Sequence, residues 1–416
     1  MNSFDEELNQ RLVALREQNL FRELRRVDSA QGPRIEIGGK TFLNFSSNDY
    51  LGLANHPALK EAATKAVEKF GAGAGASRLI CGSLAPFHEL EATLAVFKGT
   101  EAALTFSTGY AAALGTITAL LGKDDVIIVD KLVHACIVDA AKLSGAKLRV
   151  FDHNDLEDLE KILKWAEKNI QHSTFNIQHR RRILIVTESI FSMDGDAALL
   201  REIVALKEKY GAWLMVDEAH ATGLYGPNRR GLAEALGVSD RIEIQMGTLG
   251  KALGASGGYI CGSRALIDFL VNRARSFIFS TAPVPAATAA AKAGIQLIQS
   301  SEGATRLAQL WRHVQLVGDD VRSLKLSPAG SQRLLTSSPT NTTTASAIIP
   351  IIIGDEVKAV AAAAKFREQN IFIPAIRYPT VARGLARLRV TLTAAHTKAD
   401  VEELLTALSQ IENHKS

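Results

Sequence analysis

The feature that most constrains the fold of this chain is a series of short, almost wholly apolar segments that alternate with helix-like segments from about residue 56 onward. Such continuous short runs are typical of strands that are buried on both faces. Strands that alternate with helices form a mostly parallel sheet between helical layers, so we predict an α/β fold. The expected strands lie at 102–106, 126–129, 147–151, 183–187, 212–216, 242–246 and 258–261.

The two ends of the chain depart from this pattern. Residues 5–26 are expected to form an amphipathic helix, and GPRIEIGGKTFLNFSS is expected to form a hairpin that turns at Gly38-Gly39. After a helix at 283–299, the C-terminal part is expected to be α+β, with helices at 303–323, 355–368 and 398–412 and strands near 347–352 and 386–392. A chain of 416 residues exceeds the roughly 250–300 at which single cores stop growing. We therefore expect an N-terminal segment (1–55), a large domain (56–288) and a small C-terminal domain (289–416).

Charge and cysteine content exclude several classes of protein. The net charge is +4, and the one compact basic cluster, 180–182, leads into an apolar run, so we expect no nucleic-acid partner. No apolar run approaches about 18 residues, so we expect no membrane span. The first residues are charged and amphipathic, unlike a secretory signal. The three cysteines lie far apart without a CxxC spacing, which predicts no disulfide, no metal site and a cytoplasmic location: Cys81, Cys136 and Cys261.

Three further segments are assigned no chemistry. FGAGAGASRL, residues 70–79, loosely matches a dinucleotide-binding fingerprint, but that fingerprint must follow a strand and the preceding segment is helical. We expect an active-site or interface loop there. The polar stretches 170–181 and 330–345 are expected to be surface loops.

LMVDEAHATG, residues 214–223, places an acidic and a basic side chain at the end of an expected strand. Functional groups in parallel sheets gather where the strands end. Asp217 can pair there with a buried cation, such as the protonated ring nitrogen of pyridoxal phosphate (PLP), and so preserve the ring as an electron sink. In the alternative interpretation, Asp217 caps a helix and His220 is an ordinary core histidine.

GTLGKALGASGG, residues 247–258, puts a single lysine among small residues just past another expected strand. Glycines let the backbone approach a ligand closely. Desolvation lowers the pKa of a partly buried lysine, which makes Lys251 a competent amine for a Schiff base with PLP, and Thr248 could donate to the phosphate. The alternative is a surface lysine in a glycine-rich loop. The presence of the LMVDEAH segment upstream makes this alternative weaker.

Four other positions carry side chains or backbone suited to this chemistry. FSTGYAAALG opens a small-residue helix at Gly109, whose unpaired N–H groups suit a phosphate, although an ordinary Ser/Thr cap is the alternative. His134 could stack on a cofactor ring or belong to the core. Ser192 could reach the phenolic oxygen of the cofactor or make a turn hydrogen bond. Of Arg387 and Arg389, one could bind a carboxylate through two parallel hydrogen bonds, while surface pairing is expected for the other.

Taken in order along the chain, several motifs resemble the α-oxoamine synthases, PLP enzymes that condense an amino acid with an acyl thioester and release CO2. The resemblance extends from about residue 20 to 412. The motifs are SSNDYLGLANHP (46–57), TGYAAALG (108–115), DKLVHACI (130–137), TESIFSMDGD (187–196), LMVDEAHATGLYG (214–226) and GTLGKALGASGGYI (247–260).

The resemblance implies a PLP aminotransferase-like large domain and a role for each matching residue. Lys251 would carry PLP as a Schiff base and act as the base, and Asp217 would pair with the ring nitrogen. His134 would stack on the ring. His220 and Ser192 would lie beside the phenolic oxygen.

The resemblance also assigns the phosphate end of the cofactor. Gly109, Tyr110 and Thr248 would hold it. Family members are homodimers with the active site at the interface, so Ser280 and Thr281 would reach the phosphate of the partner subunit.

Substrate contacts follow from the same resemblance. Asn48 and Arg22 would face the substrate, Arg389 would bind the amino-acid carboxylate, and Thr380 would line the acyl pocket. The N-terminal arginine could equally be Arg25 or Arg26.

The C-terminal stretch IRYPTVARGLARLRVTLTAAHT, residues 376–397, resembles the biotin-pathway members of the family, which join L-alanine to a pimeloyl thioester. It departs from them at Tyr378 and at Ala382-Arg383, which bears on acyl-chain preference. The alternatives are a glycine-using acyltransferase or aminolevulinate-type synthase, an aminotransferase or lyase, and an inactive subunit, which would be expected to lack the lysine. The thioester carrier, coenzyme A or an acyl carrier protein, is left open.

Overall fold

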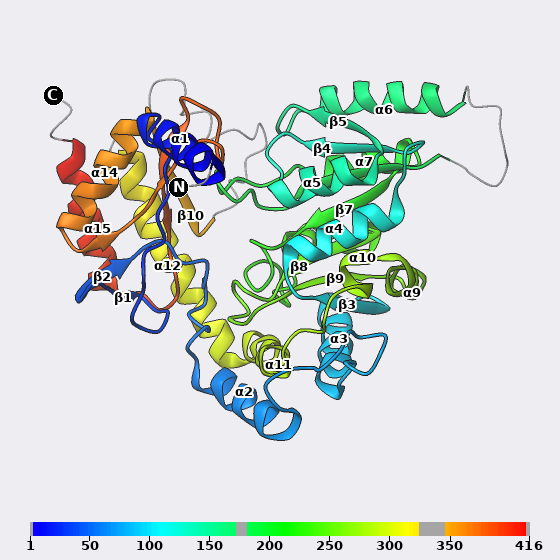
Figure 1. Ribbon diagram of the computed structural model, residues 1–416, viewed down its shortest axis with the longest axis horizontal. Coiled ribbons are helices and arrows are strands. Elements are labelled where there is room, and N and C mark those ends of the chain that lie inside the picture. The colour runs from blue at the N-terminus through cyan, green and yellow to red at the C-terminus, as the bar shows by residue number, and fades with distance from the viewer. Residues whose placement is uncertain (1–2, 172–180, 324–345, 413–416) are drawn as a thin grey trace. The chain divides into compact units, whose positions relative to one another are not determined.

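The computed structural model describes residues 3–171, 181–323 and 346–412 (Figure 1). The chain divides into two compact units. The large unit contains Leu51–Ser192 and Asp196–Leu307, and the small unit contains Met1–Tyr50, Met193–Gly195 and Ala308–Ser416. The expected loop at 330–345 and most of the one at 170–181 lie outside the described residues.

A seven-stranded sheet forms the centre of the large unit, in the order β3-β9-β8-β7-β6-β4-β5 (Figure 1). Neighbouring strands from β8 to β5 are parallel, and β9 is antiparallel to both of its neighbours. The predicted, mostly parallel sheet is therefore confirmed. The strands are β3 (Ala102–Phe106), β4 (Val126–Asp130), β5 (Lys147–Phe151), β6 (Ile183–Glu188), β7 (Trp213–Asp217), β8 (Ile244–Thr248) and β9 (Gly258–Gly262).

Helices cover both faces of this sheet. Ile127 and Val129 of β4 pack in one core cluster with side chains of α4, α5 and α9, while the intervening Ile128 is equally inaccessible to solvent. Alternate residues of a strand point to opposite faces, so both faces are buried. The helices are α2 (Pro57–Phe70), α3 (Ala85–Lys98), α4 (Gly109–Leu120), α5 (Ala135–Ser144), α6 (Leu156–Gln171), α7 (Leu200–Lys209), α8 (Leu232–Ala235), the 3-10 helix η1 (Ser239–Arg241), α9 (Arg264–Arg273), α10 (Arg275–Ile278) and α11 (Pro285–Gln299).

One expected strand and the glycine-rich segment 70–79 can be compared with the structure of the large unit. The strand expected at 242–246 begins only at Ile244, because Ser239–Arg241 forms a 3-10 turn before it. The glycine-rich segment 70–79 follows α2, not a strand, and Gly71 ends that helix with a φ of 79°. Such a backbone conformation favours glycine, so these glycines shape a loop and do not form a dinucleotide fingerprint.

The small unit contains two three-stranded sheets, in the orders β1-β2-β11 and β10-β13-β12. The predicted hairpin is present, and its turn residues Gly38 and Gly39 have φ values of 57° and 75°, as a tight two-residue turn requires. Helix α12 (Ser301–Ser323) begins in the large unit and continues into the small one. The other elements are α1 (Ser3–Glu17), β1 (Arg34–Ile37), β2 (Lys40–Asn44), β10 (Ile348–Gly354), α14 (Glu356–Glu368), β11 (Ile371–Phe372), β12 (Ala375–Ile376), β13 (Ala386–Thr391) and α15 (Lys398–Glu412).

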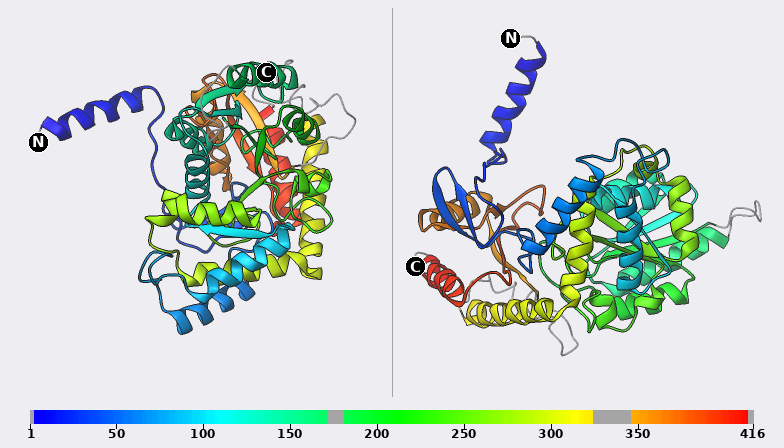
Figure 2. Two further views of the ribbon diagram at one scale, coloured as in Figure 1. Left: turned by 90° about the vertical axis from the view of Figure 1, so that its right-hand side faces the viewer. Right: turned by 90° about the horizontal axis from the view of Figure 1, so that it is seen from below.

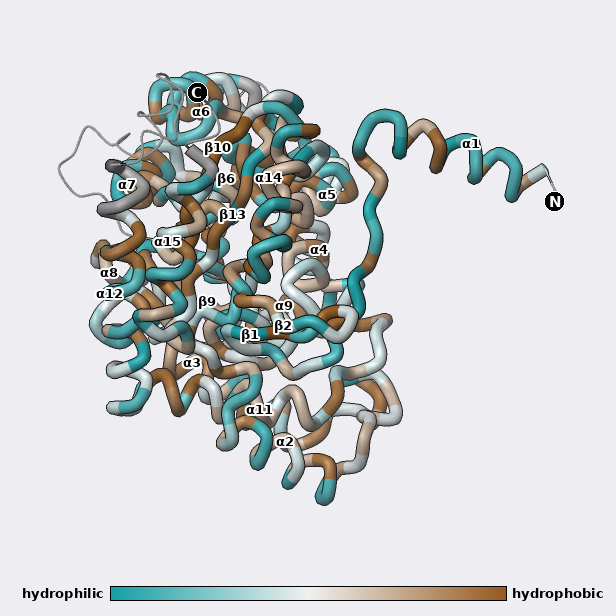
Figure 3. Tube along the Cα trace, turned by 90° about the vertical axis from the view of Figure 1, so that its left-hand side faces the viewer, coloured by the Kyte–Doolittle hydropathy of each residue, from teal (hydrophilic) through white to brown (hydrophobic). Residues whose placement is uncertain are grey.

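The N-terminal helix is shorter than predicted. We expected it to span 5–26, but α1 ends at Glu17, and Asn19 adopts a left-handed conformation with a φ of 55° that stops a helix. None of the residues of α1 is buried, and Figure 2 shows it standing away from the hairpin of its own unit. Hydrophilic and hydrophobic residues alternate along it (Figure 3). Among the described helices, none has the length and apolarity needed to cross a membrane.

Candidate active site

A cavity of about 170 Å³ lies in the large unit beside the ends of β6, β7 and β8. This is where ligands bind in sheets of this kind. Its lining brings together seven of the predicted residues: Gly109, Tyr110, His134, Asp217, His220, Thr248 and Lys251. Gly247, from the glycine-rich motif that contains Thr248 and Lys251, also lines it. Cys136, Glu188, Ala219 and Met246 complete the wall.

Lys251 is the half-buried cation of this cavity. It follows β8 in a turn that is closed by a hydrogen bond from the Gly254 N–H to the Lys251 carbonyl. Its Nζ lies 2.7 Å from Nε2 of His220. As an ammonium group Nζ can only donate, so this contact requires a His220 ring whose Nε2 carries no proton.

Asp217 is the last residue of β7 and is buried. Its Oδ1 accepts a hydrogen bond of 2.9 Å from the backbone N–H of Ala219. Burial raises the pKa of Asp217, and the charge of Lys251 acts in the opposite direction. A cation at this carboxylate would be strongly favoured, because a buried charge is stable only when it is paired.

His134 caps the N-terminus of α5, and its Nδ1 accepts a hydrogen bond of 3.2 Å from the backbone N–H of Cys136. Burial lowers the pKa of His134. The ring is therefore neutral near pH 7 and has a fixed orientation, with one nitrogen committed to the helix cap. Both properties suit a ring that stacks on a flat cofactor.

The cavity wall also contains the start of α4. Thr108 caps this helix by accepting a hydrogen bond from Ala111, and Gly109 is its first residue. The Tyr110 hydroxyl donates to Asp139 Oδ2 at 2.6 Å, and the Thr248 hydroxyl donates to the Gly257 carbonyl at 3.0 Å. The N–H groups of the first helical turn have no partner within a helix, so those at Gly109 and Tyr110 could bind an anion here.

Glu188, the last residue of β6, is a cavity residue that the sequence analysis missed. It lies beside Asp217 in the register of β6 and β7. Burial, with a further contribution from Asp217, raises the pKa of Glu188 to about 8. Its carboxylate accepts backbone hydrogen bonds from His134 and Ser192, while its Oε1 is buried without a hydrogen-bond partner within the described structure. The rule that located Asp217, a polar residue at a strand end, applies equally to Glu188.

Three predicted cofactor residues of the large unit are not part of the cavity lining: Ser192, Ser280 and Thr281. Ser192 is buried, Ser280 is half-buried and Thr281 is exposed. Thr281 forms an isolated β-bridge with Ser77 of the glycine-rich segment. The two segments around Ser77 and Thr281 therefore lie side by side in the large unit.

The predicted substrate residues form two pairs in the small unit. Nη1 of the buried Arg389 donates to Asn48 Oδ1 at 3.1 Å, and Nη2 of Arg22 donates to Thr380 Oγ1 at 3.2 Å. Arg387 forms an ion pair with Asp194 whose side chains are only 4% and 11% exposed. The surface pairing that we expected for one of the two strand arginines is therefore a buried pairing instead.

These cavity residues fit PLP. A buried carboxylate, Asp217, suits the ring nitrogen, and the neutral ring of His134 suits its face. The helix N-terminus at Gly109 suits the phosphate. Lys251 supplies the amine, and its neighbour His220 supplies a partner for a phenolic oxygen. Among the described residues, no group of three or more acidic, histidine or cysteine side chains is placed to hold a metal ion.

Known proteins resemble the chain over almost its whole length. The aminotransferase class I and II family model matches residues 40–408. The 8-amino-7-oxononanoate synthase of Anaeromyxobacter sp. (strain K) is 47% identical over 401 residues, which is 96% of this chain and 94% of the relative. That of Geotalea daltonii is 45% identical over 411 residues, 99% of this chain and 98% of the relative.

The chain belongs to the 8-amino-7-oxononanoate synthase family. It is a PLP-dependent enzyme of the acyltransferase type.

Solved structures agree with this family membership. Serine palmitoyltransferase of S. paucimobilis, with a bound PLP–myriocin aldimine, has a TM-score of 0.86 and 28% identity, covering 99% of this chain and 98% of that one. The 8-amino-7-oxononanoate synthase of Francisella tularensis has a TM-score of 0.71 and 26% identity, covering 90% of this chain and 98% of that one. The predicted aminotransferase-like fold is therefore confirmed.

Proposed function

We propose that this enzyme joins L-alanine to a pimeloyl thioester, giving 8-amino-7-oxononanoate, CO2 and the free thiol, in the biotin pathway. The observation that carries the proposal is the contact of 2.7 Å between Lys251 Nζ and His220 Nε2 in the same cavity as the buried Asp217. An amine, a proton partner and a buried carboxylate are what this reaction needs from the protein. The relatives' name supplies the product.

Bound PLP supplies an electron-withdrawing ring that stabilises negative charge at the amino-acid Cα. Lys251 Nζ would hold the cofactor, and its free amine would act as the base that takes the Cα proton. A positioned base of this kind contributes roughly 10²–10⁴-fold to the rate. Asp217 keeps a proton on the ring nitrogen, because the buried carboxylate is stabilised by that positive charge.

The remaining side chains bind and orient. His134, whose imidazole is fixed by the cap of α5, would stack on the cofactor ring. His220 and Ser192 would serve its phenolic oxygen, and the N–H groups at Gly109 and Tyr110, with Thr248, would hold its phosphate.

The substrate roles are assigned to the small unit. Arg389, whose guanidinium is held by Asn48 and Thr391, binds the carboxylate of alanine. Arg22 and its hydrogen-bond partner Thr380 line the acyl site. We further propose a cytoplasmic homodimer in which Ser280 and Thr281 contact the phosphate bound by the partner subunit.

A substrate panel tests this proposal. L-alanine, glycine and L-serine would each be paired with pimeloyl, acetyl, succinyl and palmitoyl thioesters, with the product identified by mass. L-serine and the palmitoyl thioester belong in the panel because of the structural similarity to serine palmitoyltransferase. L-alanine with the pimeloyl thioester should give the highest kcat/KM. A higher value with glycine or L-serine would contradict the substrate assignment, and release of a keto acid without any thioester would indicate an aminotransferase.

The carrier is the second variable of the panel. The pimeloyl group would be presented once on coenzyme A and once on an acyl carrier protein, at matched concentrations. The carrier that gives the higher kcat/KM is the one that the enzyme prefers. The cofactor and the reaction are the same with either carrier.

A further inference from the structure

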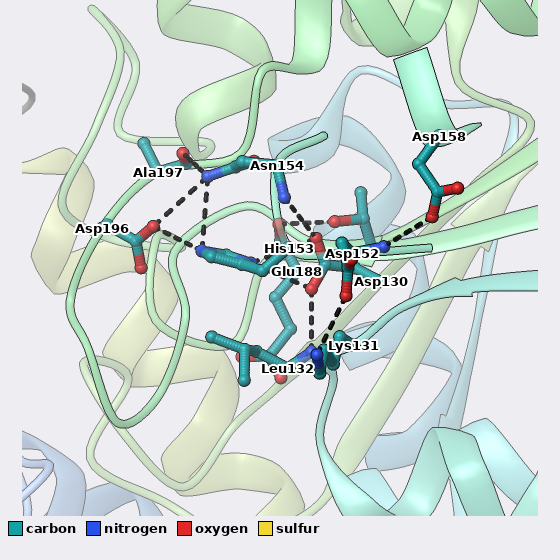
Figure 4. A network of polar contacts seen from close by, with 11 residues as sticks. Asp130, Lys131, Leu132, Asp152, His153, Asn154, Asp158, Glu188, Asp196 and Ala197 are labelled. Atoms are coloured by element: carbon teal, nitrogen blue, oxygen red, sulfur yellow. Dashed lines mark hydrogen bonds and ion pairs between the residues drawn. The ribbon is translucent and has the colours of Figure 1, made fainter. Parts of the chain in front are cut away.

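His153, in the turn after β5, lies between two aspartates in the large unit (Figure 4). Its Nδ1 lies 2.9 Å from Asp130 Oδ1, and its Nε2 lies 2.7 Å from Asp196 Oδ2. The side chain is 18% exposed, and its ring packs edge-on against Phe191 at 4.4 Å between centroids. An imidazole donates from both nitrogens only when it is protonated, so this geometry describes a cation between two carboxylates.

The ionisation of His153 agrees with this geometry. Burial lowers the pKa of His153, but the hydrogen bonds to Asp130 and Asp196 outweigh it and raise the pKa to about 10. The imidazole of His153 is therefore a cation at neutral pH. Hydrogen bonds between charged groups are the strong ones in proteins.

Asp130 connects His153 to the segment that carries His134. Asp130 ends β4, and its Oδ1 also accepts a hydrogen bond of 2.8 Å from the backbone N–H of Leu132. The Val133 N–H bonds to the Asp130 carbonyl at 3.3 Å. These contacts shape the turn that delivers His134 to the cavity wall at the start of α5.

Asp196 connects His153 to the loop that carries Ser192. The loop closes through an isolated β-bridge between Ile190 and Ala197 and a hydrogen bond of 2.9 Å from the Phe191 N–H to the Asp196 carbonyl. Nδ2 of Asn154, the residue after His153, donates to Asp196 Oδ2 at 3.2 Å and to the Ala197 carbonyl at 3.1 Å. The turn that contains His153 thus holds the base of this loop at several points (Figure 4).

We propose that His153 is a positioning residue for the cofactor site, because its imidazole ties the segment that carries His134 to the loop that carries Ser192. Both segments meet again at the carboxylate of Glu188, which accepts a backbone hydrogen bond from each. His153 itself is absent from the cavity lining, so it acts through these residues. The inference rests on the proposed cofactor roles of His134 and Ser192.

The test is the release of PLP from the purified holoenzyme, with the visible circular dichroism of the bound cofactor as a second readout. His153→Leu removes both contacts to the aspartates. The variant should release PLP at least about tenfold faster than the wild type and show altered visible dichroism, because it loses two hydrogen bonds between charged groups that connect the segments of His134 and Ser192. A merely structural role would lower the melting temperature and leave both readouts unchanged.

Asp196→Asn provides a milder variant that keeps a hydrogen-bond acceptor for Nε2 but removes one charge. It should release PLP about threefold faster or more, and more slowly than His153→Leu. If His153→Leu does not fold, Asp196→Asn alone tests the proposal. The proposal is overturned if each of these two variants that folds releases PLP within twofold of the wild-type rate.

His56→Leu is the matched control. His56 is also in the large unit, and its Nε2 contacts Glu302 Oε1 at 3.0 Å with a side chain 13% exposed, but it caps α2 and does not line the cavity. Its PLP release should equal that of the wild type. A wild-type chain that binds no PLP would contradict the proposed function itself, whereas wild-type behaviour of the variants of His153 and Asp196 in a PLP-binding enzyme would contradict only this inference.

Discussion

At the scale of single residues, the electrostatics of Asp217 determine what the cavity can hold. Burial raises the pKa of this carboxyl, and Lys251 is the cation that opposes the shift. In the proposed holoenzyme, a protonated ring nitrogen would be a second cation for this carboxylate. The carboxylate and the ring would then stabilise each other's charge.

Asp217→Asn tests this coupling. The amide has the same shape but cannot hold a proton on the ring nitrogen. The variant should retain PLP and lose about 100-fold or more in kcat, since a hydrogen bond to a charged group contributes up to about 3 kcal/mol. Asp125→Asn is a matched control, because Asp125 is also buried but bonds to backbone N–H groups of Gly122 and Arg182 away from the cavity. Near-normal turnover of Asp217→Asn would contradict the role.

The two arginines of β13 offer a second test at this scale. Arg389→Lys keeps the charge but loses the planar fork that binds a carboxylate through two hydrogen bonds. The KM for L-alanine should rise about tenfold or more, with kcat less affected. Arg387→Lys should leave this KM unchanged, because Arg387 is paired with Asp194. Equal effects of the two changes on KM would contradict the assignment.

Sequence reasoning located Lys251, Asp217, His220 and His134 because each stands in a motif beside an expected strand end, and the structure brings them to one cavity. It missed Glu188 and His153. Glu188 directly follows an expected strand, so the rule that located Asp217 could have found it, although its pairing with Asp217 is visible only once β6 lies beside β7. His153 depends on the contact of the turn after β5 with Asp196, which no local pattern reports.

At the scale of the elements, a buried ion pair links α3 to the end of β7. Lys98 Nζ lies 2.5 Å from Glu218 Oε2, with side chains 0% and 1% exposed, and Glu218 Oε1 accepts a hydrogen bond of 2.9 Å from the Ala233 N–H. Glu218 directly follows Asp217. The pair therefore fixes the turn that carries Asp217 and His220.

Lys98→Met should lower the free energy of unfolding by about 3–5 kcal/mol, because it leaves the carboxylate of Glu218 buried without its cation. Urea denaturation measures this loss. The double variant with Glu218→Gln should recover part of it, since no charge is then left unpaired. Lys65→Met removes a pair of similar length, 2.6 Å to Glu61, on the exposed face of α2 and should change nothing measurable. Equal effects of the two lysine changes would contradict this account.

A buried histidine stabilises the small unit in a pH-dependent way. His396 Nδ1 accepts from the Thr393 N–H, its Nε2 bonds to the Asn44 carbonyl at 3.0 Å, and its ring stacks on Phe45. Burial lowers the pKa of His396 from 6.5 to about 4. The unfolded chain therefore takes up this proton first, so the contribution is complete above pH 6.5 and is lost as the pH falls towards 4.

Between pH 8 and pH 5 this histidine should account for about 2 kcal/mol of lost stability. Urea denaturation at the two pH values, compared between the wild type and His396→Gln, isolates the contribution. The loss on acidification should be smaller in the variant by that amount. An identical loss in both proteins would show that His396 does not carry this dependence.

At the scale of the whole molecule, the sequence predicts the architecture better than the boundaries of its parts. Alternating apolar segments predicted the sheet, because burial on both faces leaves a continuous hydrophobic signature. The N-terminal helix was predicted too long, because its amphipathic spacing continues past Asn19, where the backbone turns left-handed. Local patterns also did not predict that β9 pairs antiparallel to its neighbours. The direction of pairing depends on how the chain connects two strands and not on the residues within one strand.

The central claim is that Lys251 holds the cofactor covalently in the cavity beside Asp217. Borohydride converts an imine into a stable amine, so reduction of the holoenzyme followed by peptide mass spectrometry locates the attached lysine. We expect one pyridoxyl-phosphate adduct, on the peptide that contains Lys251, and no adduct in Lys251→Ala. An adduct on another lysine, or a Lys251→Ala variant that keeps the visible absorbance of the holoenzyme, would contradict the account.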